Sequence, residues 1–113
     1  MSIQVESYGH AVILNLKGDL AEDTLGAFSQ EVDRQLEGKE VVDIVLNMEA
    51  VTFVDSQALE ALLDLQDRLA ERLGQVRLVK CQDNVAKILE ITALDSVFES
   101  FDDVNEAVKA LET

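Results

Sequence analysis

The sequence has no proline and no tryptophan, one cysteine (Cys81) and one histidine (His10) among its 113 residues. A single cysteine excludes an internal disulfide and any metal cluster held by cysteines alone. A single histidine cannot hold a metal ion by itself, so we expect neither a metal nor another cofactor. Cys81 follows a predicted strand and is expected to be a small, half-buried residue, because a redox role would require a lowered thiol pKa.

Basic residues are scarce as well. Nine lysines and arginines stand against twenty-three aspartates and glutamates, which gives a net charge of −14. Nucleic acids and anionic membranes bind cationic patches, so we expect neither as a partner. Solubility alone would account for an acidic surface. The functional interpretation is a protein partner with a basic face, reached by electrostatic steering.

Long apolar runs are also missing. No run approaches the roughly 18 residues of a membrane helix. The chain begins with a strand-like pattern rather than the basic and then apolar segments of a secretory signal. We therefore expect a cytoplasmic protein that forms a single domain over residues 1–113.

The pattern that remains alternates strands and helices. Strands are expected at residues 3–8, 11–17, 41–47 and 76–80, with a short candidate strand at 97–100. Helices are expected at residues 23–37, 56–73, 83–91 and about 104–111. Gly38 and Gly74 are expected to end the first two helices. The predicted core face of the second helix consists of Leu59, Leu62, Leu63, Leu69, Ala70 and Leu73.

The links between these elements predict the topology. The two-residue link Gly9-His10 suits an antiparallel hairpin, whereas strands separated by helices form parallel crossovers. The expected fold is therefore α/β, with a mixed sheet of four to five strands and about four helices packed against it.

The clearest functional signal is Asp55-Ser56, between a strand and an amphipathic helix. A serine there places its hydroxyl at a helix N-terminus, where free N–H groups and the helix dipole suit an anion. In the simplest interpretation, Asp55 caps the helix and Ser56 only helps to initiate it. A catalytic serine would need a base and an oxyanion hole, and His10 lies in a predicted turn, so we reject that interpretation. The third is phosphorylation, which adds roughly −1.5 to −2 charges and would mainly affect a partner docked over this end of the helix.

Acidic residues continue along the same helix. Ser56, Glu60, Asp64, Asp67 and Glu71 follow one another at a spacing of 4, 4, 3 and 4, so they share one edge. This edge has two interpretations. It is either a solvated face with internal pairs such as Asp64–Arg68, or a docking strip for a basic groove.

Four segments together resemble the STAS family, in the form found in bacterial anti-sigma factor antagonists. Val45-Leu46-Asn47-Met48 is similar to the family's apolar strand, with Asn47 in the place of its asparagine. Phe53-Val54-Asp55-Ser56 is similar to the segment that holds the phosphorylated residue, which corresponds to Ser56. Gly18-Asp19-Leu20 resembles the Gly-Glu-Leu after the second strand. Leu94-Asp95-Ser96-Val97-Phe98 stands where the family has a segment before its last strand.

This resemblance implies a non-enzymatic switch. The unphosphorylated form would bind an anti-sigma factor with serine-kinase activity and so release a sigma factor. Phosphorylation of Ser56 would weaken that complex, and a phosphatase would restore it. Asp55 would cap the helix and orient the serine, and Asn47 would support the loop. The partner interface would comprise Gln57, Glu60, Asp64, Asp67 and Glu71.

The sequence departs from the family pattern beside the serine. The family commonly has Ser/Thr-Gly-Leu-Gly, whereas this chain has Gln57-Ala58-Leu59-Glu60. We expect Ala58 and Glu60, in place of the two glycines, to make the surface bulkier and more acidic. An acidic residue that helps the family's kinase partner to dock is Ala21 here. These differences favour an alternative function as a constitutive STAS subunit of a larger complex, such as a lipid-transport ATPase or a chemoreceptor-linked assembly.

Overall fold

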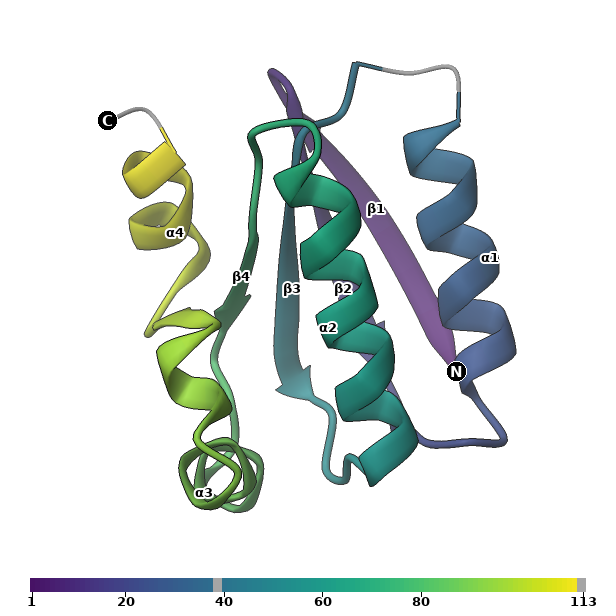
Figure 1. Cartoon of the computed structure of the whole chain (residues 1–113), viewed down its shortest axis with the longest axis vertical. Coiled ribbons are helices and arrows are strands. Elements are labelled where there is room, and N and C mark those ends of the chain that lie inside the picture. The colour runs from purple at the N-terminus through teal and green to yellow at the C-terminus, as the bar shows by residue number, and fades with distance from the viewer. Residues whose placement is uncertain (38–39, 112–113) are drawn as a thin grey trace.

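Five strands form one sheet in the order of the chain. They are β1 (Ser2–Tyr8), β2 (Ala11–Lys17), β3 (Asp43–Ala50), β4 (Val76–Val79) and β5 (Glu99–Phe101). In the computed structural model, which describes residues 1–37 and 40–111, β1 and β2 are antiparallel and all later neighbours are parallel (Figure 1). The expected mixed α/β sheet with an opening hairpin is confirmed.

Four helices pack against this sheet, as expected. They are α1 (Leu25–Leu36), α2 (Ser56–Ala70), α3 (Asp83–Ile91) and α4 (Val104–Leu111), with a short 3-10 turn at Leu94–Ser96. None of the helices over residues 1–37 and 40–111 is long and apolar enough to span a membrane. The left-handed stop expected at Gly38 lies outside the described residues.

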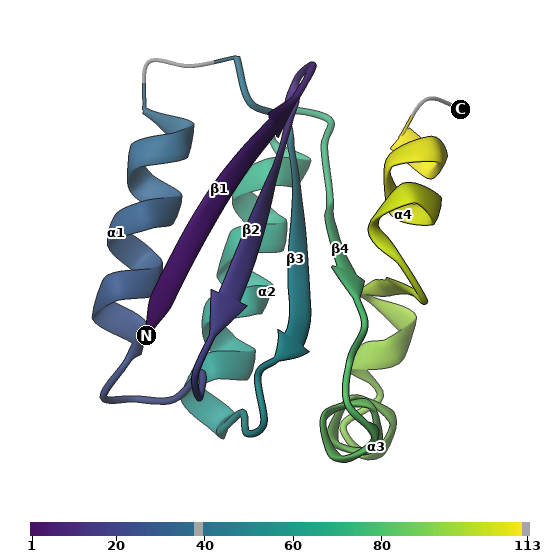
Figure 2. The ribbon, with the colours of Figure 1, turned by 180° about the vertical axis from the view of Figure 1, so that it is seen from behind.

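The two faces of the sheet are covered unequally. Ile44 and Leu46 of β3 belong to the large core under α1, α2 and α3, whereas Val45 belongs to a smaller cluster with Ala107 and Val108 of α4. Successive strand residues point to opposite faces, so α4 packs on the face away from the other helices. Figure 2 shows that α4 lies beside β4, on the side of the sheet away from β1.

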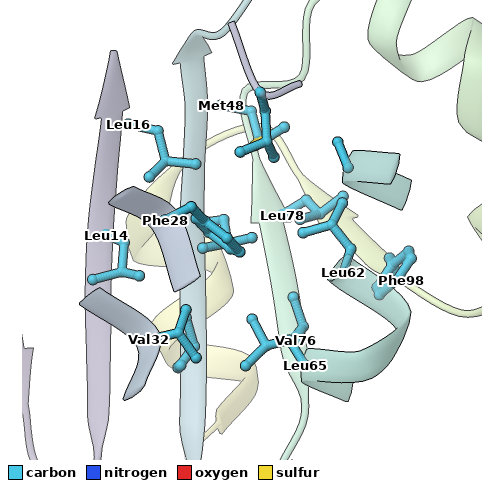
Figure 3. Close-up of a cluster of buried hydrophobic side chains, with 14 of the residues drawn as sticks. Leu14, Leu16, Phe28, Val32, Met48, Leu62, Leu65, Val76, Leu78 and Phe98 are labelled. Atoms are coloured by element: carbon cyan, nitrogen blue, oxygen red, sulfur yellow. The ribbon is translucent and has the colours of Figure 1, made fainter. Parts of the chain in front are cut away.

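The large core fixes α1 and α2 relative to each other. Phe28 and Val32 from α1 meet Leu62 and Leu65 from α2 above the strands (Figure 3). All four side chains are buried. Burying such a side chain stabilises the fold by about 1.5–3 kcal/mol, so these two helices form a rigid layer over β1 to β4.

The predicted end of α2 is wrong by one turn. The helix ends at Ala70, which is exposed, and Leu73 is 96% exposed rather than part of the core. Leu73 adopts the left-handed conformation with φ of 64°, and the Gly74 N–H donates to the Leu69 carbonyl at 2.8 Å. A β-carbon on Gly74 would overlap the Val42 carbonyl, so glycine is required there for close approach.

Three other elements have boundaries that differ from the expectation by two residues or more. α1 begins at Leu25 rather than near residue 23, because Thr24 closes a preceding turn by donating to the Asp19 carbonyl at 2.7 Å. β3 runs from Asp43 to Ala50 instead of over residues 41–47. The last strand covers Glu99–Phe101 instead of residues 97–100, because Phe98 is buried in the large core.

Candidate functional site

Ser56 is the first residue of α2 and is exposed to solvent. It follows the loop at the carboxyl end of β3, at the lower end of α2 in Figure 1. Among the described residues its hydroxyl has no hydrogen-bond partner, so no contact within the fold would have to break for it to react.

Asp55 is the N-cap of α2 and holds two segments together. One carboxylate oxygen accepts from the Ala58 N–H at 2.8 Å, and the other accepts from the Glu22 N–H at 2.9 Å. These backbone donors, Ala58 first and then Glu22, lower the pKa of Asp55 below its usual value. An ionised carboxylate therefore links the start of α2 to the loop between β2 and α1.

The same two loops are also joined through their backbones. The Leu20 N–H donates to the Phe53 carbonyl at 2.9 Å, and the Asp55 N–H donates to the Leu20 carbonyl at 3.3 Å. The Thr52 hydroxyl donates to a carboxylate oxygen of Asp19 at 2.8 Å. Ser56 is thus presented by two loops that brace each other at the carboxyl ends of adjacent parallel strands.

Phe53 was not singled out by the sequence analysis, although it lies three residues before Ser56. Its side chain is 48% exposed. An aromatic residue within an apolar segment normally reads as core, so the sequence pattern offered no signal for its exposure. Exposed aromatic side chains are common anchors in protein interfaces.

Asn47 lies apart from the Ser56 loop. Its amide nitrogen donates to the Asn15 side-chain oxygen at 2.8 Å, and its amide oxygen accepts from the Glu49 N–H at 3.1 Å. The side chain thus joins β2 to β3. Within residues 1–37 and 40–111, neither bond reaches the loop before Ser56.

The five residues expected to form the partner interface along α2 are all at the surface. Gln57, Glu60, Asp64, Asp67 and Glu71 are exposed, and Glu71 is the C-cap of the helix. Ala58, by contrast, is completely buried. Our expectation that Ala58 makes the surface bulkier is therefore wrong, because of the two residues that replace the family's glycines only Glu60 is exposed.

The pair between Asp64 and Arg68, named in one of the two interpretations of this edge, does not form. Arg68 instead donates to a carboxylate oxygen of Asp33 on α1 at 2.9 Å. Arg72 likewise turns toward other elements, donating to the carbonyls of Val41 at 3.0 Å and Leu36 at 2.8 Å. Arg68 of α2 and Arg72, two residues after the helix ends, are thus engaged across the fold. Asp64 and Asp67 have no basic partner in the described part of the chain.

His10 and Cys81 take no part in this site. His10 lies in the β1–β2 turn, at the other end of the sheet from Ser56, and its Nδ1 is 3.2 Å from the Glu40 carbonyl oxygen. A base at that position cannot activate the Ser56 hydroxyl. Burial raises the pKa of the half-buried Cys81 thiol to about 11, so the thiol stays protonated at neutral pH.

Comparison with known families and proteins agrees with this architecture. The family model of the STAS domain matches residues 2–107. The chain is 23% identical over 114 residues to the anti-sigma F factor antagonist of Paenibacillus polymyxa, and the match covers 99% of this chain and 97% of the relative. Its structure is similar to that of a Thermotoga maritima protein proposed to be an anti-sigma factor antagonist. The TM-score is 0.91 at 22% identity, covering 98% of this chain and 95% of that one.

Two further solved structures place this fold in different settings. The Bacillus cell fate determinant SpoIIAA in its phosphorylated form matches with a TM-score of 0.75 at 19% identity, over 97% of this chain and 99% of that chain. The murine anion transporter Solute Carrier 26 family member A9 matches with a TM-score of 0.80 at 19% identity, over 95% of this chain and 18% of the transporter. At these identities the likeness shows the fold alone.

Proposed function

The chain belongs to the STAS domain family, and from that premise we propose that it is a non-enzymatic regulatory adaptor of the anti-sigma factor antagonist type. In this proposal it binds an anti-sigma factor with serine-kinase activity, and phosphorylation of Ser56 controls the complex. The observation that carries the proposal is the exposed Ser56 hydroxyl, free of hydrogen bonds among the described residues, at the first position of a helix whose cap is supplied by Asp55.

The surroundings of Ser56 explain why a phosphate there would act on a partner rather than on the fold. Asp55 already occupies the Ala58 N–H, so a phosphate on Ser56 would not take over the helix cap. Glu60, one turn further along the helix, is exposed and has the same sign of charge. The dianion is therefore directed into solvent, where a docked partner would have to desolvate it.

The unmodified surface has features that suit a kinase partner. Phe53, three residues before Ser56, offers an exposed aromatic side chain. The exposed residues assigned to the interface from Ser56 onward are Gln57, Glu60, Asp64, Asp67 and Glu71. A partner with a basic face would be attracted by these carboxylates and by the net charge of −14. In this proposal, binding releases a sigma factor from the kinase, and a phosphatase restores the binding form.

The proposal is tested by affinity capture from the native cell lysate, with the wild type and Ser56→Asp as parallel baits. Ser7→Asp is the matched control, because Ser7 is exposed on β1 and the substitution adds the same charge far from Ser56. We expect the wild type and the control to capture a serine kinase that Ser56→Asp loses. Incubation of that kinase and ATP with the wild type should then add one phosphoryl group, detected by intact mass, and none to Ser56→Ala.

Ser56→Asp must also leave the fold intact for this comparison to hold. A carboxylate in the first helical turn gains about 0.3–1 kcal/mol from the helix dipole and loses a few tenths to Glu60. We therefore expect melting temperatures within a few degrees of each other by circular dichroism. A large fall for Ser56→Asp alone would contradict the placement of the helix start at Ser56.

A second candidate function keeps the fold and omits the phosphoswitch. Two differences beside Ser56 favour it, because both make the serine a poorer phosphorylation site. Gln57 stands where the family commonly has a second hydroxyl residue, and the exposed Glu60 is acidic. In that case the chain is a constitutive STAS subunit of a larger complex, such as a lipid-transport ATPase or a chemoreceptor-linked assembly. Capture of the same assembly by the wild type and by Ser56→Asp would support this function and contradict the switch.

A further inference from the structure

A groove separates α1 from α2 on the outer side of the helical layer. Its volume is about 500 Å³, which falls in the usual range of ligand-binding clefts. Phe28 and Val32 from α1 and Leu65 from α2 line the groove and are themselves buried, as members of the cluster in Figure 3. On α2 the groove extends from Ala61 to Arg68, a distance of about 10 Å at 1.5 Å per residue.

The rim of this groove is acidic. Asp33 of α1 and Asp64 and Asp67 of α2 line it, and all three are exposed. The single basic residue among the lining residues, Arg68, is paired with Asp33 at 2.9 Å. Asp64 and Asp67 form no ion pair with a lysine or arginine in the described part of the chain.

We propose that this groove docks a short cationic amphipathic helix of a partner protein. An aliphatic side chain of that helix would enter the space above Phe28, Val32 and Leu65. A lysine or arginine one helical turn away would bind Asp64 and Asp67, because residues three or four apart lie on one face of a helix. The length of the groove suits one apolar anchor and one basic side chain.

This inference deepens the proposed function, since Asp64 and Asp67 belong to the surface assigned there to the partner. It extends that surface into the groove that α2 forms with α1, where Asp64 and Asp67 lie two or more helical turns from Ser56. It also gives Arg68 a role. Its pair with Asp33 bridges the two helices, so Arg68 competes with an incoming cation for Asp33.

In the test, a synthetic helical peptide of alternating leucine and lysine pairs is titrated into the purified chain. Binding is measured from the changes in the amide chemical shifts of the chain by NMR. No kinase takes part, so failure of this inference is distinguishable from failure of the phosphoswitch. We expect saturable shifts confined to α1 and α2 around Phe28 and Leu65. The peptide with glutamate in place of lysine should produce none.

Substitutions at the rim then distinguish binding in the groove from non-specific attraction of the cationic peptide to the acidic chain. Asp64→Asn should weaken binding about tenfold, the loss expected for one charge-assisted contact. Glu90→Gln on α3 removes the same charge from another exposed surface and should change affinity little. Arg68→Gln should tighten binding several-fold by freeing Asp33, whereas Lys87→Gln on α3, with the same change in net charge, should not. Equal effects of the matched variants, or shifts spread over the whole surface, would overturn the inference.

Discussion

Asp55 and Ser56 are neighbours in the chain but have different physical tasks. Asp55 is committed to the fold, because its two oxygens accept from backbone N–H groups of Ala58 and Glu22 in separate segments. Ser56 has no hydrogen bond to its hydroxyl among the described residues and can change without cost to the helix. Asp55 holds the site in place, and the Ser56 hydroxyl is left available for modification.

This division makes stability sensitive to the protonation of Asp55. The backbone donors lower the pKa of Asp55 in the folded state. The resulting stabilisation is fully present above the ordinary aspartate pKa of about 3.9 and is lost as the pH falls through the lower folded-state pKa. Asp55→Asn should therefore be less stable than the wild type at pH 7, and the difference should shrink toward the acid limit. Urea unfolding of both proteins across this pH range measures it.

The control for this prediction is Asp23→Asn, which removes an exposed carboxylate that accepts no hydrogen bond among the described residues. It should follow the wild type at every pH. If the difference in the free energy of unfolding between Asp55→Asn and the wild type stays constant below pH 4, ionisation of the Asp55 carboxylate is not the cause of that difference.

Among the secondary-structure elements, the turn between α2 and β4 depends most on a single residue. Gly74 lies against the carbonyl of Val42, just before β3 begins. Because a β-carbon would overlap backbone atoms rather than a movable side chain, the turn or the start of β3 would have to shift. The position thus couples the end of α2 to the start of a central strand.

Gly74→Ala should therefore lower the free energy of unfolding by about 1–3 kcal/mol, as overpacking generally does. The matched control is Gly26→Ala in α1, where a β-carbon meets no atom within 4 Å. That substitution should raise stability by about 0.5 kcal/mol, because alanine loses less conformational entropy in a helix. Urea unfolding should thus move the two midpoints in opposite directions. Equal midpoints would contradict the close approach at Gly74.

For the whole molecule, the net charge of −14 is the dominant electrostatic property. Repulsion among these charges opposes the compact state, whereas the same charges attract a basic partner. Raising ionic strength from about 0.01 to 0.15 M shortens the Debye length from about 30 to 8 Å, which weakens both effects.

Salt should therefore stabilise the free protein and weaken its complex over the same range. We expect the melting temperature to rise with added sodium chloride, while the dissociation constant for the captured partner increases. Potassium chloride should act identically, because screening depends on ionic strength and not on the cation. An affinity independent of salt would contradict the acidic docking surface.

Much of this fold could be predicted because its signals are local. Gly9-His10 between two strand patterns specifies the hairpin, and Asp55-Ser56 before an apolar stripe specifies the start of α2. The interior of each helix and strand was predictable for the same reason, since the period of the apolar residues is set by the backbone itself. The ends were less predictable. Leu73 fits the helical period of α2 but lies beyond Ala70 in the turn, where it is exposed.

By itself, the sequence determined the strand and helix order, the acidic character of the molecule and the position of a serine at a helix start. Only the tertiary structure decided which distant groups meet there. It placed the Glu22 N–H on Asp55, turned Arg68 to Asp33 instead of Asp64, exposed Phe53 and opened a groove between α1 and α2. The physical reason is that local patterns report which face of an element is apolar, whereas such contacts depend on how separate elements pack against each other.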